Sequence, residues 1–264
     1  MKVLLTVGHS ILKTGQCTSA DGRPYGGVLE YSYNKGIVHQ VAAYLRKVGH
    51  AVDVLICPEL QFSKSTEEKT YKLNFEKAGN YDLVMELHLN SSVLHNARGS
   101  EVLYYSEKGK VFADRIQKQL ITVFSDHGND KRDNLYMLTQ TKAPAVIVES
   151  FFCDSPADCE LAGKTDVALL IAQGIHGGII EPEKQQEQTG FLYRVQTGAF
   201  REKENAENLL NKLKSLGFEA FITSVDVDGI LYRVQVGAYS QRTNALNMKK
   251  KLQAAGFEAI IVQA

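Results

Sequence analysis

The stretch that decides the fold is Tyr81-Asp-Leu-Val-Met-Glu-Leu-His-Leu-Asn90. Its apolar residues follow one another with little interruption, which is typical of a strand buried on both faces of a parallel α/β sheet. Two polar residues interrupt this run, Glu86 and His88. Because ligands of open α/β sheets bind beyond the carboxyl ends of the strands, we expect His88 to lie at a functional edge.

Strands and helices alternate on both sides of this stretch. The alternation predicts an α/β domain with a mostly parallel sheet and helices on both faces. Residues 125–134 are polar and without a period, so we expect a loop there. The expected strands are 2–7, 51–56, 81–90, 99–105 and 144–149, and the expected helices are 28–48, 66–77, 108–124, 155–161 and 167–180.

Length and charge limit the classes of function. The chain has 264 residues, with 30 Lys plus Arg and 30 Asp plus Glu, so its formal net charge is zero. A neutral chain gives no electrostatic reason to expect a nucleic-acid partner or an anionic membrane surface. The amino-terminal apolar run is too short for a signal peptide or membrane helix, so we expect cytoplasmic synthesis and no membrane insertion. The four cysteines form no Cys-x-x-Cys pair, and we expect free thiols.

The last third of the chain repeats itself. Phe191-Leu-Tyr-Arg-Val-Gln-Thr-Gly-Ala-Phe200 recurs as Ile230-Leu-Tyr-Arg-Val-Gln-Val-Gly-Ala-Tyr239. Each copy is predicted to form a strand, a helix and a strand, which together make one small ferredoxin-like βαββαβ domain. The polar residues 181–190 are typical of an interdomain linker. We therefore expect domains at 1–180 and 191–264.

Four polar side chains are predicted at one edge of the first sheet. His9 follows the strand 2–7, Glu30 lies in the first turn of a helix, and His88 and Glu149 end buried strands. Two imidazoles and one carboxylate suit Zn²⁺, which as a catalytic ion takes three protein ligands. Each residue alone also has an ordinary explanation, such as a hydrogen-bonded structural histidine or a carboxylate favoured by the helix dipole. A buried Glu149, however, needs a partner or a catalytic role.

The same residues resemble a known family. Gly8-His9, Glu30 followed by Asn34, His88-Leu89-Asn90 and Pro144-Ala-Val-Ile-Val-Glu149 are similar to motifs of the zinc-dependent N-acetylmuramoyl-L-alanine amidases of the Amidase_3 class, over residues 1–180. The resemblance implies that His9, Glu30 and His88 bind zinc and that Glu149 is catalytic. It also implies a peptidoglycan substrate, cleaved between N-acetylmuramic acid and the L-alanine of the stem peptide.

Glu86 has no role in this resemblance. By strand alternation Glu86 and His88 share a face. Glu86 either supports His88 or pairs with a nearby Lys or Arg, and the ion pair is the simpler interpretation.

The carboxyl-terminal repeats resemble the SPOR domain, over about residues 190–264. This resemblance implies binding to peptidoglycan, especially to glycan strands without stem peptides. Gln196 and Arg233 match positions that the family uses for glycan, and strand alternation adds Arg194 and Gln235 to the same open face. An aromatic residue that some members carry near Leu231 is absent. The ordinary alternative is that these polar residues only solvate an open sheet.

Two other functions stay open. One is a zinc carboxypeptidase that acts on stem peptides, and the other is a peptidoglycan-binding protein without catalysis. For a lytic amidase the expected settings are a phage endolysin released by a holin and a sporulation autolysin released by mother-cell lysis.

Overall fold

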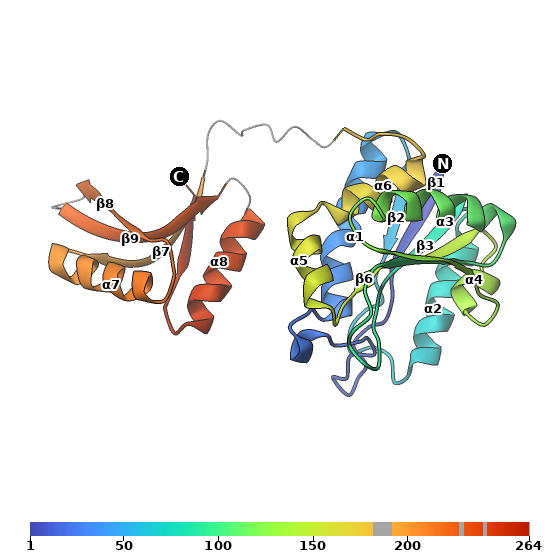
Figure 1. Cartoon of the computed structure of the whole chain (residues 1–264), viewed down its shortest axis with the longest axis horizontal. Coiled ribbons are helices and arrows are strands. Elements are labelled where there is room, and N and C mark those ends of the chain that lie inside the picture. Colours follow the sequence, from blue (N-terminus) through green and yellow to red (C-terminus); the bar gives the residue numbers. More distant parts are fainter. Residues whose placement is uncertain (182–191, 227–229, 240–241, 264) are drawn as a thin grey trace. The chain divides into compact units, whose positions relative to one another are not determined.

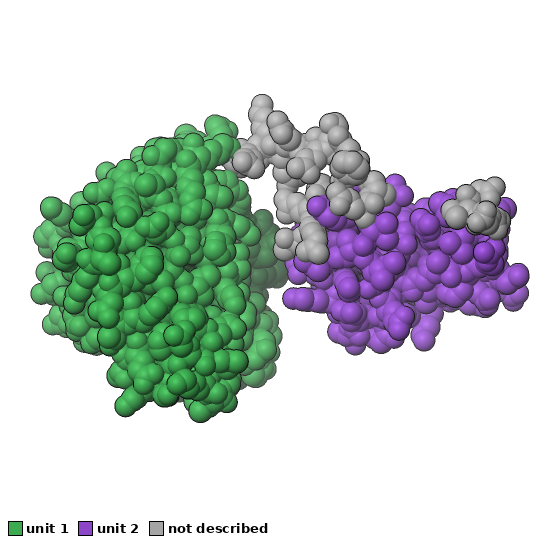
Figure 2. Space-filling model, turned by 180° about the vertical axis from the view of Figure 1, so that it is seen from behind, with its two compact units in different colours: residues 1–182 green, residues 183–264 purple. Residues whose placement is uncertain are grey.

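The structure is a computed structural model that describes residues 1–181, 192–226, 230–239 and 242–263. The chain forms two compact units, Met1–Pro182 and Glu183–Ala264, drawn in green and purple in Figure 2. Apart from Glu181, the predicted linker 181–190 lies outside the described residues.

The first unit is built on a six-stranded sheet with the order β2-β1-β3-β6-β4-β5. Neighbouring strands are parallel except β4 and β6, which are antiparallel. The predicted mostly parallel sheet is therefore confirmed. The strands are β1 Lys2–Val7, β2 Ala51–Leu55, β3 Leu83–Asn90, β4 Ser100–Tyr104, β5 Asp126–Lys131 and β6 Ala145–Phe152.

Helices cover both faces of this sheet (Figure 1). The larger apolar core lies between the sheet and α1, α3 and α6, and a smaller one includes α4 on the opposite face. No helix among the described residues is long and apolar enough to cross a membrane. The helices are α1 Glu30–Lys47, α2 Ser65–Ala78, α3 Glu107–Leu120, α4 Tyr136–Thr139, α5 Pro156–Lys164 and α6 Val167–His176, with a short 3-10 helix at Arg23–Tyr25.

The prediction of a loop over 125–134 was wrong, because β5 occupies Asp126–Lys131. This strand contains no apolar residue and is half or fully exposed along its length. It lies at the edge of the sheet and pairs only with β4, so its backbone hydrogen bonds form without a buried face. Apolar alternation, the signal used to predict strands, is absent from such an edge strand.

The second unit has the predicted ferredoxin-like element order. Its four strands lie in the order β10-β7-β9-β8, and every neighbouring pair is antiparallel. Val195, Val234 and Val236 pack with α7 and α8 in a core on one face, which leaves the other face without helices. The elements are β7 Tyr193–Phe200, α7 Lys203–Ser215, β8 Phe221–Asp226, β9 Ile230–Tyr239, α8 Arg242–Ala254 and β10 Ile260–Gln263.

Close contact between α6 and α3 gives a test of the packing in the first unit. A Cβ added at Gly174 would lie 2.5 Å from Ile116 Cα, so Gly174→Ala must push the two helices apart. We expect a loss of about 1–3 kcal/mol in the free energy of unfolding. Gly163→Ala in the exposed part of α5 meets nothing within 4 Å and should stabilise by up to about 1 kcal/mol. Urea unfolding followed by circular dichroism measures both, and equal midpoints would contradict this account.

Candidate metal centre

Side chains from three segments converge at the carboxyl ends of β1 and β3. His9 follows β1, His88 lies near the end of β3, and Glu30 is the first residue of α1. Each offers one ligand atom, and the three atoms lie within 4.8 Å of one another. His88 Nδ1 is 3.0 Å from one Glu30 oxygen, and His9 Nε2 is 3.4 Å from the other. The structure thus brings together the three residues that the sequence singled out as metal ligands.

The turn after β1 is shaped around the ring of His88. A Cβ at Gly8 would lie 2.2 Å from His88 Cε1, so only glycine leaves room for this ring. His9 has a φ of 65°, in the left-handed region that residues other than glycine rarely adopt. This unusual backbone directs the His9 ring toward Glu30, and the two histidine rings meet edge to face at 4.9 Å.

Glu30 is held in place by backbone amides. Leu89 N donates to Oε1 at 3.1 Å and Ala20 N donates to Oε2 at 3.0 Å. The side chain is buried. Burial alone would raise the pKa of Glu30, but hydrogen bonds with His88 and His9 lower this pKa far below its usual range. Glu30 is therefore a fixed, ionised carboxylate.

His88 lies between two carboxylates. Its Nε2 is 2.9 Å from Glu86 Oε1, on the side of the ring away from Glu30. Burial would lower the pKa of His88, but hydrogen bonds with Glu30 and Glu86 raise it well above its usual value. Glu86 Oε2 in turn accepts a hydrogen bond of 2.6 Å from Lys72 Nζ. Both interpretations of Glu86 therefore apply, because this carboxylate contacts His88 and pairs with a lysine.

Glu149 stands next to His88 on the neighbouring strand. The two residues are in register in the pairing of β3 with β6. Glu149 Oε2 is buried and has no hydrogen-bond partner among the residues that the structure describes. Burial raises the pKa of Glu149 to about 7; the positive charge of His88 opposes the shift and the charge of Glu30 adds to it. This carboxyl group can therefore both accept and donate a proton near neutral pH.

Two groups near this edge were missed by the sequence analysis. Glu101 on β4 is in register with Glu149. Asn90 Nδ2 donates a hydrogen bond of 3.3 Å to Glu101 Oε2. His95 Nδ1 lies 2.7 Å from the buried Asp154, and its ring stacks on Tyr25 at 3.5 Å. Glu101 is near Glu149 because β4 pairs with β6 in antiparallel orientation, and no local pattern in the sequence indicates this pairing.

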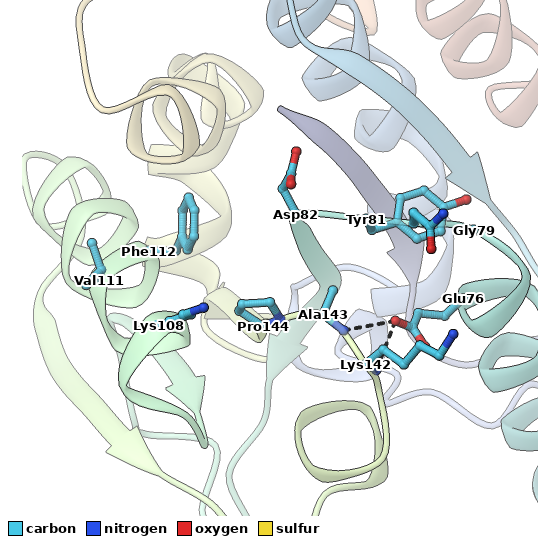
Figure 3. Close-up of a pocket in the computed structure, with 11 residues that line it drawn as sticks. Glu76, Gly79, Tyr81, Asp82, Lys108, Val111, Phe112, Lys142, Ala143 and Pro144 are labelled. Carbon is cyan, nitrogen blue, oxygen red and sulfur yellow. Dashed lines mark hydrogen bonds between the residues drawn. The ribbon is translucent and has the colours of Figure 1, made fainter.

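A separate cleft of about 480 Å³ opens at the other end of the strands (Figure 3). Its lining includes Gly79 to Asp82 just before β3 and Lys142 to Pro144 just before β6. Glu76 in its wall accepts hydrogen bonds from the backbone nitrogens of Lys142 and Ala143. This cleft contains none of the candidate metal ligands.

The sheet face of the second unit without helices carries a row of four side chains. Gln196 of β7 and Gln235 of β9 are cross-strand partners at the centre of the sheet. Ile260 pairs with Gln196 on one side and Phe221 pairs with Gln235 on the other. The glutamines are only 7% and 2% exposed, whereas Ile260 and Phe221 are 58% and 45% exposed. Two apolar side chains thus flank a covered polar pair.

The two predicted arginines lie in neighbouring rows of the same sheet. Arg194 pairs with Ala238 and Val262, and Arg233 pairs with Ala199 and Thr223. Both arginines are half-buried.

Two imidazoles and a fixed carboxylate beside a free carboxyl group, at the strand ends of an α/β sheet, define a candidate hydrolytic metal centre. Residues 3–181, more than half of the chain, match the N-acetylmuramoyl-L-alanine amidase family. Residues 189–263 match the SPOR domain. The chain therefore belongs to the N-acetylmuramoyl-L-alanine amidase family and carries a carboxyl-terminal SPOR domain. It is a peptidoglycan amidase, and peptidoglycan is its partner.

Several known proteins are similar to the chain. The catalytic domain of the CD27L endolysin targeting Clostridia difficile is 49% identical, with a TM-score of 0.66, over 69% of this chain and 99% of that one. The amidase CwlM of Bacillus licheniformis is 28% identical over 231 residues, which is 84% of each chain. A sporulation-specific amidase of Bacillus subtilis is 28% identical over 151 residues, 55% of this chain and 58% of its own length.

The contact between Gly8 and His88 gives a test of the centre. In Gly8→Ala the new Cβ must displace the His88 ring, so we expect the cluster to lose its capacity to hold a divalent metal. Gly36→Ala is the matched control, because Gly36 is exposed on α1 and meets nothing within 4 Å. Metal content after loading, measured by mass spectrometry, should fall in Gly8→Ala only. Equal metal content in both variants would contradict this geometry.

Proposed function

We propose that the chain hydrolyses the amide between N-acetylmuramic acid and the L-alanine of the stem peptide, as a zinc enzyme. His9, Glu30 and His88 would hold the ion, and Glu149 would move the protons. The observation that carries this proposal is the convergence of three ligand atoms within 4.8 Å, beside a buried carboxylate oxygen without a partner.

The donor set fits zinc in chemistry, because zinc in proteins prefers imidazole nitrogen and carboxylate oxygen as ligands. One ligand atom from each of His9, Glu30 and His88 lies within 4.8 Å of the other two, so a single ion could reach all three. When bound, zinc supplies a Lewis acid that polarises a carbonyl group and makes water more acidic.

The side chains of the protein supply the remaining chemistry. The free Oε2 of Glu149 takes a proton from the attacking water, whose oxygen bonds to the carbonyl carbon of the lactyl group. The same carboxyl group then gives the proton to the departing nitrogen of L-alanine, as the C–N bond breaks. A pKa raised to about 7 by burial suits both transfers. The products are the carboxylate of the muramic acid and a free amino-terminal alanine.

The role of Glu149 can be tested by substitution. In Glu149→Gln the side chain keeps its size but can no longer take up a proton, so we expect kcat to fall by about 10²- to 10⁴-fold. Bound zinc should stay at one per chain, since Glu149 is not among the ligands. Glu160→Gln, at an exposed residue of α5 that forms an ion pair with Lys164, is the control and should keep full activity. Full activity of Glu149→Gln would exclude this role.

The bond that is cut can be read from the ends that digestion creates. Purified peptidoglycan treated with the full chain should yield glycan without peptide and new amino-terminal alanine. New reducing sugar ends would contradict amidase chemistry, and release of a carboxyl-terminal amino acid would indicate a carboxypeptidase instead. If peptidoglycan stays uncut although zinc is bound, the chain would be a peptidoglycan-binding protein without catalytic activity.

We also propose that the SPOR domain binds glycan on its sheet face without helices. The half-buried Arg194 and Arg233 would form hydrogen bonds with the sugars, and the covered pair Gln196 and Gln235 would form the polar floor of the site between them. Phe221 is exposed and in register with Gln235. It provides an aromatic surface on β8, the strand that pairs with the strand of Leu231, β9. An aromatic ring next to hydrogen-bonding groups suits a sugar, which has apolar faces and polar edges.

Glycan binding can be measured with the inactive Glu149→Gln chain and insoluble glycan strands stripped of peptides. Adding Arg233→Ala or Phe221→Ala should weaken retention by about 3- to 10-fold, the value of one lost contact. Lys203→Ala changes an exposed residue of α7 and should leave retention unchanged. Equal retention by all variants would show that glycan does not bind to this face.

Two cellular settings are supported by relatives of the chain. The similarity to an endolysin catalytic domain supports lysis of the cell wall after holin-mediated release, and the similarity to a sporulation-specific amidase supports action after mother-cell lysis. The substrate bond is the same in both settings.

A further inference from the structure

Helix α2 buries a row of charged side chains against the sheet. Glu68, Lys72 and Glu76 are spaced four residues apart, so they lie on one face of the helix. All three are buried, and Lys72 is among the largest fully buried side chains. Buried charged residues require partners, and the partners of this row show what it does.

Lys72 connects the helix to two strands. Its Nζ donates to the carbonyl oxygen of Val7 at 2.7 Å and to Glu86 Oε2 at 2.6 Å. Glu86 Oε1 lies 2.9 Å from Nε2 of His88. Because an ionised carboxylate only accepts hydrogen bonds, Nε2 carries a proton here. Nδ1 faces Glu30, which is also a candidate metal ligand, so Nδ1 is the ring nitrogen that would give up its proton to bind a metal.

Glu68 holds the neighbouring segment. Ser10 Oγ donates to Glu68 Oε1, and Ser10 is fully buried directly after His9. Lys72 binds the carbonyl oxygen of Val7, on the other side of the Gly8-His9 pair. Helix α2 therefore holds both ends of the turn in which His9 adopts its left-handed backbone.

Stability of the fold does not explain this arrangement. A buried ion pair gains about as much from its attraction as it loses by leaving water, and an apolar pair of the same size often serves the fold as well. What an apolar pair cannot do is accept a hydrogen bond from His88 or donate one to the Val7 carbonyl. The charges are needed only if the orientation of these groups matters.

We propose that Lys72, Glu86 and Glu68 are positioning residues that fix the metal-binding orientation of His88 and His9. This inference rests on the proposed zinc function. Carboxylates that orient metal-ligating histidines commonly change metal affinity by about 10- to 100-fold. Glu76 belongs to the same row but binds the amides of Lys142 and Ala143 at the opposite end of the sheet, so it has no part in this role.

The test measures zinc affinity of the full chain by competition with a chelator, and unfolding by circular dichroism. The double variant K72M/E86L replaces the ion pair by apolar residues of similar size. We expect zinc binding to weaken by about 10- to 100-fold while the midpoint of thermal unfolding without metal stays the same or rises. Glu86→Gln keeps an acceptor for His88 and should recover much of the affinity.

Two further variants complete the test. Ser10→Ala removes the contact with Glu68 and should weaken zinc binding by about 10-fold. Glu76→Gln, the matched control, should bind zinc like the unchanged chain even if it unfolds more easily. Unchanged zinc affinity in K72M/E86L and Ser10→Ala would overturn the proposal; if the double variant fails to fold, Ser10→Ala decides. Absence of zinc binding in the unchanged chain would instead refute the proposed function.

Discussion

The arrangement of the candidate metal centre in the first unit depends on the contacts of the Glu30 carboxylate. Each of its oxygens is held from two sides, Oε1 by His88 and the amide of Leu89, and Oε2 by the amide of Ala20 and His9. One side chain thereby joins the start of α1, the end of β3 and the loop that follows β1. A carboxylate fixed by two amides loses little freedom when it binds a metal, because its orientation is already set. The geometry of the centre thus follows from the fold around Glu30.

The two faces of the central sheet have different tasks. On one face, apolar side chains of α1, α3 and α6 form the larger core, and they provide most of the buried apolar surface. On the other face, α2 contributes charged residues that contribute little net stability. Strand alternation connects the two tasks, because Met85 and Leu87 pack into the large core while Glu86 and His88 point to the other side. The larger apolar core therefore packs on one face of β3, and Glu86, which contacts His88, lies on the other face, beside the smaller core.

The sequence predicted the parts of this design that have a local signal. Strands β1, β3 and β6 are buried on both faces and were visible as apolar runs. His9 and His88, near the ends of β1 and β3, were candidate ligands, and Glu149 of β6 was the candidate catalytic residue. Strand β5 was missed because an edge strand needs no apolar pattern. The partner of Glu86 could not be predicted from the sequence, for a different reason. Alternation placed Glu86 beside His88, but Lys72 is identified only when α2 is packed on the sheet, and its charged row resembles an ordinary solvated helix face in the sequence.

The glycan site proposed on the second unit would not need a high affinity, because that unit is covalently joined to the enzyme. A binding domain joined to an enzyme converts a second encounter into an intramolecular one, with an effective concentration set by the length and stiffness of the connection. The glycan site proposed above, with the half-buried Arg233 and the exposed Phe221 on the open sheet face, would then need only a few contacts to hold the enzyme at the wall. Weak binding also means fast dissociation, because most differences in affinity lie in the dissociation rate. An enzyme that must reach many bonds along an insoluble polymer gains more from such contacts than from a site that holds one strand for long.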